Sequence, residues 1–129
     1  MDAYTEVVIA PPALYLIPVA ERLTHPNVKV SAQNCYIQPS GAYTGETSPA
    51  QLADAQIPYV ILGHSERRTL FGDTSAIVAQ KTAAALKHGL SVILCCGETL
   101  QEREEGKTVA VVEEQIGEVV KALKPEDWK

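Results

Sequence analysis

The chain has 129 residues, of which 46% are apolar and 21% charged, and its formal net charge is −5. These values are typical of a single globular domain, residues 1–129, and differ from the concentrated positive charge of nucleic-acid-binding proteins. The longest apolar stretch, residues 7–20, contains three prolines and is too short for a membrane-spanning helix. We therefore expect neither nucleic acid nor a membrane among the partners.

The three cysteines, Cys35, Cys95 and Cys96, are an odd number and include one adjacent pair. They form no Cys-x-x-Cys spacing, so we expect no zinc site and no structural disulfide. Residues 1–6 lack the basic segment that opens a secretory signal. Together these features predict a reducing, cytoplasmic location.

Four short runs rich in valine and isoleucine alternate with segments of helical spacing. The runs cover residues 7–10, 28–32, 59–63 and 91–96, and turn-forming residues bound each of them. Such runs are typical of buried strands. Their alternation with helices predicts right-handed βαβ units and a parallel sheet, an α/β fold.

Helices are expected over residues 13–23, 48–56, 74–88 and 107–123. Ser48 is a favourable N-cap for the second, and Asp73 is a candidate cap for the third, which Gly89 would end. Pro18 either breaks the first helix or lies in its first turn. Residues 34–47 form a long loop without periodicity, and loops of this kind are usually functional or interfacial.

The motif Gly-His-Ser-Glu-Arg-Arg at residues 63–68 directly follows a predicted strand, so His64 lies at the strand end where α/β proteins bind ligands. Ser65 can cap a following helical turn, whose N-terminus would keep the imidazole neutral and able to donate a hydrogen bond. The alternative is a histidine that only satisfies a backbone carbonyl. For residues 66–68 the favoured interpretation is a solvated turn with weak ion pairs. Cys95 and Cys96 end another predicted strand, so one should face inward and the other outward, and small core filler is favoured over a reactive thiol.

Neither the dinucleotide-binding glycine motif nor the P-loop motif occurs, which disfavours those two functions. Instead, several motifs in order resemble the triosephosphate isomerase family. They are Ala10-Pro11-Pro12, Ala32-Gln33-Asn34-Cys35, Gly41-Ala42-Tyr43-Thr44-Gly45-Glu46, Leu62-Gly63-His64-Ser65-Glu66-Arg67-Arg68, Phe71-Gly72, Gly97-Glu98 and Glu102-Arg103-Glu104. The resemblance implies a partial (β/α)₈ TIM barrel. It also implies the glycolytic and gluconeogenic interconversion of dihydroxyacetone phosphate and glyceraldehyde 3-phosphate through an enediolate, without metal or cofactor.

The resemblance further implies roles for residues at the strand ends. His64 would be the electrophile that polarises the substrate carbonyl, with Ser65 helping to orient its ring. Glu66 would support the ammonium group of an active-site lysine. Cys95 would pack beneath the catalytic glutamate, and Glu98 is counted among the supporting residues.

The loop at residues 34–47 resembles the family's dimer loop, so a homodimer is implied. Its tip, with Thr44 and Gly45, would enter a pocket of the neighbouring subunit. Glu46 and Arg67 would form an ion pair across the interface, and Gln33 would line the same contact.

The resemblance covers strands two to five of a barrel that usually needs about 250 residues. The family's Asn-x-Lys pair on the first strand and its Tyr-Glu-Pro motif on the sixth lie outside this stretch, so we expect the isolated chain to be inactive. One alternative is a non-catalytic half-barrel that acts through oligomerisation along its open strand edges. A second is a flavodoxin-like sheet, with helices on both faces, that binds a phosphorylated ligand.

Overall fold

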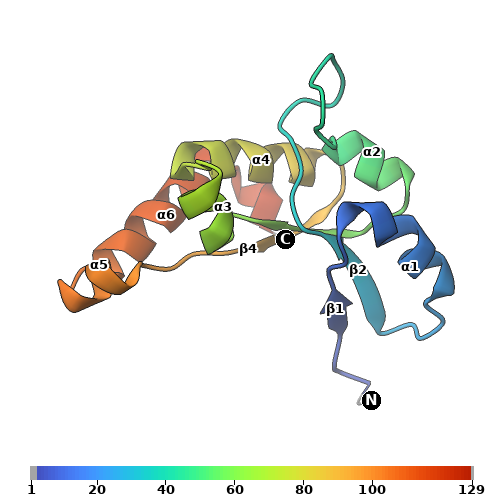
Figure 1. The fold of residues 1–129 in the computed structure, drawn as a ribbon, viewed down its shortest axis with the longest axis horizontal. Helices are drawn as coiled ribbons and strands as arrows, with labels where there is room; N and C mark the ends of the chain where they lie inside the picture. Colours follow the sequence, from blue (N-terminus) through green and yellow to red (C-terminus); the bar gives the residue numbers. More distant parts are fainter. Residues whose placement is uncertain (1–2, 129) are drawn as a thin grey trace.

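The computed structural model describes residues 3–128, and its centre is one sheet of four parallel strands (Figure 1). The strands are β1 (Val7–Ile9), β2 (Val28–Ala32), β3 (Tyr59–Leu62) and β4 (Ser91–Leu94). They lie in the order β1-β2-β3-β4, and all three pairings are parallel. The predicted parallel sheet is therefore confirmed, with ends shifted by one or two residues.

Helical elements connect the strands in the predicted alternation. They are η1 (Ala13–Tyr15), α1 (Leu16–Arg22), α2 (Pro49–Asp54), α3 (Ser65–Leu70), α4 (Ser75–Lys87), α5 (Leu100–Glu104), α6 (Thr108–Ala122) and η2 (Pro125–Trp128). Pro18 is the third residue of α1. The helix tolerates it there because the N–H groups of the first turn have no partner within a helix.

The core lies between the sheet and the helices on one of its faces. Along β3 the side chains of Val60 and Leu62 are buried, whereas Tyr59 and Ile61 between them are half-buried. The buried pair packs with Val78 of α4 and with the other members of one apolar cluster. In Figure 1, α1, α2 and α4 gather on the same side of the strands. This arrangement is typical of a barrel segment and differs from the two-faced cover of a flavodoxin-like sheet.

Two helix starts show how local hydrogen bonds set the boundaries. Ser48 caps α2 through a capping box, in which its Oγ accepts from Gln51 N at 3.1 Å and its N donates to Gln51 Oε1 at 2.8 Å. The prediction of Asp73 as the cap of α4 is wrong. Thr74 is the cap, with its Oγ1 accepting from Ile77 N at 3.2 Å, because the Asp73 carboxylate is held by other residues described below.

The loop between β2 and α2 projects away from the helices (Figure 1). Its base is closed by a hydrogen bond of 2.8 Å from Tyr36 N to Thr47 O, and inside it the rings of Tyr36 and Tyr43 pack 4.7 Å apart. The loop is thus an ordered projection at the carboxyl end of β2.

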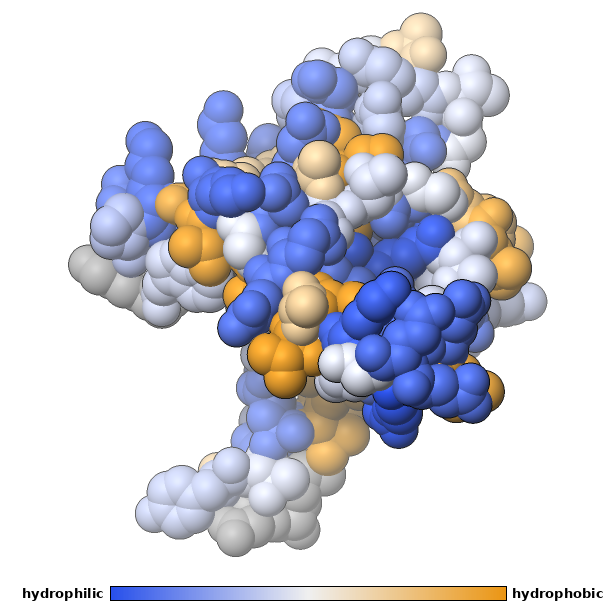
Figure 2. All heavy atoms as spheres, turned by 90° about the vertical axis from the view of Figure 1, so that its left-hand side faces the viewer, coloured by the Kyte–Doolittle hydropathy of each residue, from blue (hydrophilic) through white to orange (hydrophobic). Residues whose placement is uncertain are grey.

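Large apolar side chains are exposed on α3, α5 and α6. They include Leu70, Leu100 and Val109, each about 70% exposed. Figure 2 views this end of the molecule and shows apolar atoms lying among hydrophilic ones. Exposed apolar side chains of this kind are found on many protein surfaces.

Candidate active site

His64 lies at the carboxyl end of β3, as predicted, and is the N-cap residue of α3. Its Nδ1 accepts a hydrogen bond from Glu66 N at 3.3 Å. The prediction that Ser65 caps this turn is wrong. Ser65 is the first helical residue and is exposed, because the imidazole nitrogen takes the capping position. A nitrogen that accepts from a backbone N–H carries no proton, so this geometry assigns the ring hydrogen to Nε2.

The Glu66 carboxylate lies beside the same ring. Its Oε2 is 3.7 Å from His64 Nδ1, and the side chain is 75% exposed. Water screens an exposed pair of this kind, and the backbone N–H of Glu66 already occupies Nδ1.

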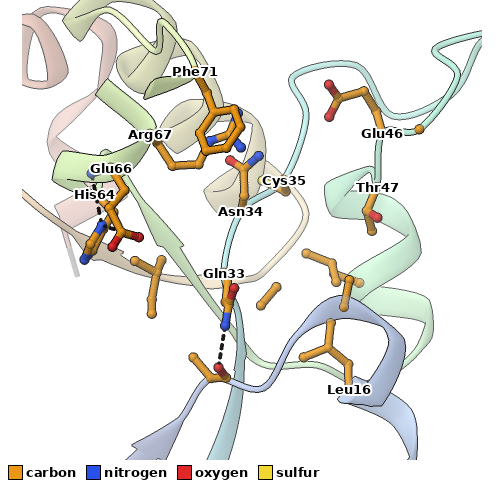
Figure 3. Close-up of a pocket in the computed structure, with 16 residues that line it drawn as sticks. Leu16, Gln33, Asn34, Cys35, Glu46, Thr47, His64, Glu66, Arg67 and Phe71 are labelled. Atoms are coloured by element: carbon orange, nitrogen blue, oxygen red, sulfur yellow. Dashed lines mark hydrogen bonds and ion pairs between the residues drawn. The ribbon is translucent and has the colours of Figure 1, made fainter. Parts of the chain in front are cut away.

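A cavity of about 540 Å³ opens beside His64 and Glu66 (Figure 3). The end of β2 lines it with Gln33, whose Nε2 donates to Ala10 O at 2.8 Å. The projecting loop contributes Gly45 and Glu46, and α3 contributes Arg67. Six of the ten predicted site residues thus meet around one hollow. The other four, which do not line it among the described residues, are Thr44, Ser65, Cys95 and Glu98.

Two residues that line this cavity, Asn34 and Arg67, belong to a charged cluster with little exposure. Asp73 accepts from Lys81 Nζ at 2.9 Å and from Arg67 Nε at 3.1 Å, and Lys81 also donates to Asn34 Oδ1 at 3.0 Å. The side chains of Lys81 and Asp73 are 5% and 8% exposed. Burial raises the pKa of the Asp73 carboxyl, but the hydrogen bonds from Arg67 and Lys81 outweigh burial and leave that pKa below its usual value. The cluster ties α3 and α4 to the end of β2.

Comparison with known proteins identifies the family. The whole chain, residues 1–129, matches the family described as triosephosphate isomerase. The chain belongs to the triosephosphate isomerase family. It is 66% identical over 128 residues to a triosephosphate isomerase from Coprinopsis cinerea, and 50% identical to those from Paracoccidioides lutzii and Neurospora crassa. Each alignment covers 99% or more of this chain and 51% of the relative. The chain therefore spans about half the length of these relatives, and its sheet is part of a TIM barrel.

The arginines of the motif at residues 63–68 have surroundings that differ from the predicted solvated turn. Arg68 is half-buried, and it donates to Gly63 O at 2.7 Å and to Cys95 O at 3.2 Å. Arg67 pairs with buried Asp73 and lies 4.7 Å from the centre of the Phe71 ring. The interpretation of residues 66–68 as a solvated turn is therefore wrong for both arginines. Lys81 was missed altogether, because nothing in an alanine-rich helix marks one lysine as buried.

The two supporting residues at the end of β4 lie in different surroundings. Burial raises the pKa of the Cys95 thiol, which agrees with core filler rather than a nucleophile. Glu98 accepts from Arg103 Nε at 2.6 Å and from Thr108 Oγ1 at 3.1 Å. The hydrogen bond from Arg103 is the main cause that lowers the pKa of the Glu98 carboxyl. Glu98 thereby links the end of β4 to α5 and to the start of α6.

The described residues show no obvious cation site and no membrane element. Residues 3–128 contain no group of three or more histidine, cysteine, aspartate or glutamate side chains placed to hold a metal ion. No helix among them is both long and apolar enough to cross a bilayer. One Asn-x-Lys triplet occurs, at residues 27–29, but it leads into the amino end of β2, whereas His64 lies at the carboxyl ends of the strands. It is therefore not the family's catalytic pair.

Proposed function

We propose that this chain supplies the carbonyl-polarising histidine of a triosephosphate isomerase. The substrates would be dihydroxyacetone phosphate and glyceraldehyde 3-phosphate. The observation that carries the proposal is the 3.3 Å hydrogen bond from Glu66 N to His64 Nδ1 at the carboxyl edge of the sheet. It leaves the opposite ring nitrogen, Nε2, as a hydrogen-bond donor.

In this mechanism His64 Nε2–H donates to the substrate carbonyl oxygen. When a base removes a proton from the adjacent carbon, negative charge moves onto that oxygen, and the donor binds the enediolate more strongly than the ground state. A neutral imidazole is the established electrophile of this enzyme family. No residue of the described sheet edge is assigned the role of base, which the family places on strand six.

Glu66 would contribute both its backbone N–H and its side chain. Its backbone N–H holds the His64 ring, and its exposed carboxylate would accept from the ammonium of the catalytic lysine contributed by strand one. Cys95 would lie beneath the catalytic base, where a protonated thiol adds no competing charge. Ser65 would help to hold the orientation of the His64 ring, and Glu98 would support the site by holding Arg103 and Thr108.

We also infer a homodimer of cytoplasmic subunits acting in glycolysis and gluconeogenesis. The cavity beside His64 joins the end of β2, the projecting loop and Arg67. The loop tip of a second copy, carrying Thr44 and Gly45, would enter this cavity. Arg67 uses Nε and Nη2 toward Asp73, and its remaining Nη1 would then pair with Glu46 of that copy.

The 129-residue chain by itself should not catalyse the reaction, because proton removal from carbon needs a positioned base. A second candidate function is a half-barrel that acts by association. It is favoured by the exposed apolar side chains on α3, α5 and α6, and by β1 and β4, each paired on one side only among the described residues. Sedimentation of the isolated 129-residue chain distinguishes the two candidate functions. A half-barrel that acts by association should form oligomers of defined size, whereas a segment of an isomerase should associate without a defined size.

The decisive experiment uses a hybrid barrel, in which the matched segment of this chain replaces its 66% identical counterpart in the C. cinerea protein. We expect the hybrid barrel to catalyse the isomerisation in a coupled assay. His64→Gln should lower kcat at least ~10²–10³-fold, the usual loss when one such donor is removed. The matched control is His25→Gln, since His25 is exposed and lies before the amino end of β2.

Two results would contradict the proposal. The first is a folded hybrid barrel without turnover. The second is a His64→Gln variant as active as its His25→Gln control. For the isolated 129-residue chain, turnover above that of its own His64→Gln variant would refute the expected inactivity.

A further inference from the structure

The Arg68 side chain joins the carboxyl ends of two neighbouring strands. Its Nε donates to Gly63 O at 2.7 Å and its Nη2 donates to Cys95 O at 3.2 Å. Gly63 directly follows β3, and Cys95 directly follows β4. Because a guanidinium group is a rigid planar fork, contacts of this kind fix the spacing of the two carbonyl groups.

The same residue holds both peptide groups that flank His64. The Gly63 carbonyl belongs to the peptide that enters His64, and Arg68 binds it through Nε. The His64 carbonyl belongs to the peptide that leaves, and it accepts from Arg68 N at 3.1 Å. The bond from Arg68 N is an ordinary backbone bond of α3, so the guanidinium group itself holds only the peptide that enters His64. With the ring nitrogen bound to Glu66 N, the direction of Nε2 depends on the position of this backbone.

Gly63 leaves room for the Arg68 side chain because glycine has no Cβ. Its φ is +73°, and a Cβ at this position would lie 2.8 Å from Arg68 Nη2 and 2.9 Å from Cys95 O. Glycine is therefore required both by the backbone conformation and by the guanidinium group packed against it. Among the described residues no carboxylate lies within ion-pair distance of Arg68, so its partners are carbonyl and hydroxyl oxygens.

We propose that Arg68 is a positioning residue that sets the direction of the His64 Nε2–H donor through the Gly63 carbonyl. This inference rests on the proposed function of His64. Arg68 itself would touch neither the substrate nor the developing charge. Its removal should lower the rate of the chemical step and leave substrate affinity nearly unchanged, because the ring would still be present but aimed less well.

A third contact of Arg68 supplies an internal comparison. Its Nη1 donates to Ser75 Oγ at 3.2 Å, and Ser75 in turn donates to Glu114 at 3.0 Å. This branch leads to α4 and α6, away from His64. Ser75→Ala removes it while leaving both carbonyl contacts in place, so it reports the structural part of Arg68's contribution alone.

The test measures kcat, KM and the thermal midpoint of the hybrid barrel with four substitutions. Arg68→Met keeps the aliphatic stem and should lower kcat by ~10–100-fold, the range expected for a displaced catalytic group, with KM changed less than about threefold. Arg68→Lys can reach one carbonyl and should fall between Arg68→Met and the parent. Ser75→Ala should keep the parent kcat. Arg22→Met is the matched control, since Arg22 also donates to a carbonyl, Pro18 O at 3.0 Å, but on the exposed surface of α1.

Each outcome decides the proposal. A folded Arg68→Met variant with parent kcat would overturn it, as would a Ser75→Ala variant that loses as much kcat as Arg68→Met. If Arg68→Met does not fold, Arg68→Lys carries the test, and failure of both to fold would reduce Arg68 to a structural residue. Loss of activity in His64→Gln with none in Arg68→Met would reject this inference while leaving the proposed function intact.

Discussion

Replacing the Asp73 carboxylate by an amide removes the only carboxylate shown to pair with Lys81 in the described chain. The Lys81 side chain is 5% exposed, so its ammonium group would keep only amide oxygens as partners in a site with little water. Removing one partner of a buried ion pair costs about 3–5 kcal/mol of unfolding free energy. For a domain of 150–250 residues each kcal/mol lowers Tm by about 2–4 °C, so Asp73→Asn should lower it by ~6–20 °C.

The assay is thermal unfolding of the hybrid barrel at several pH values. The Asp73 carboxyl has a lowered pKa in the folded chain, so its contribution is present above the unfolded pKa and is lost as the pH falls through the folded one. The Tm difference between the parent and Asp73→Asn should therefore be full at pH 7 and shrink below about pH 4.

A matched control separates burial from charge. Glu118→Gln makes the same chemical change in the pair with Lys121, whose side chain is 74% exposed, and should lower the Tm much less because water screens this pair. Lys81→Met should cost less than Asp73→Asn, because Asp73 would keep Arg67. An Asp73→Asn variant that melts within 2 °C of the parent would show that Lys81 does not depend on its buried carboxylate partner.

Three further predictions concern backbone strain, capping and thiol reactivity. Gly63→Ala should lower Tm more than Gly72→Ala, because both positions have φ near +74° but only the first would place a Cβ within 3 Å of other atoms. Equal losses would show that the close contacts are not important. Ser48→Ala should cost about 1 kcal/mol by breaking the capping box of α2, measured by denaturant unfolding, and no loss would contradict the assigned cap. Cys96, which is exposed, should react with a thiol reagent at pH 8, whereas Cys35, whose pKa burial raises to about 11, should react only on unfolding. Early modification of Cys35 by mass spectrometry would contradict this.

The strands and the position of His64 could be predicted because they depend on local patterns. Val28–Ala32 and Tyr59–Leu62 are short apolar runs between turn residues, and a residue directly after such a run lies at a sheet edge. The long helix over residues 107–123 was predicted from its spacing and is observed as Thr108–Ala122. These features need no knowledge of the rest of the chain.

The caps of α3 and α4, unlike Ser48 at α2, could not be assigned from the sequence because adjacent residues compete for them. Both Asp73 and Thr74 are good caps, and the choice fell to Thr74 because Arg67 and Lys81, from two different helices, bind the carboxylate. Likewise the N-cap of α3 is His64 and not Ser65, although histidine is not among the residue types preferred at N-caps. At α4 contacts with residues of two helices decide between the neighbours, whereas at α3 the local hydrogen bond from Glu66 N to the His64 ring decides.

The contacts of the Arg68 side chain could not be predicted from the sequence either. Sequence places two arginines side by side, but only folding brings the Cys95 carbonyl, 27 positions away, within reach of one of them. The predicted dimer contacts of Thr44, Gly45, Glu46 and Gln33 remain predictions, since they concern a second copy of the chain.

The ¹⁵N spectrum of the His64 ring in the hybrid barrel, assigned by its loss in His64→Gln, shows directly which ring nitrogen carries the hydrogen. The structure predicts a neutral imidazole whose hydrogen is on Nε2, with Nδ1 accepting from Glu66 N. The spectrum should then show one protonated and one unprotonated ring nitrogen at pH 7, with the proton on Nε2. A ring protonated on both nitrogens, or on Nδ1 alone, would contradict the account, because Nδ1 could no longer accept from the backbone.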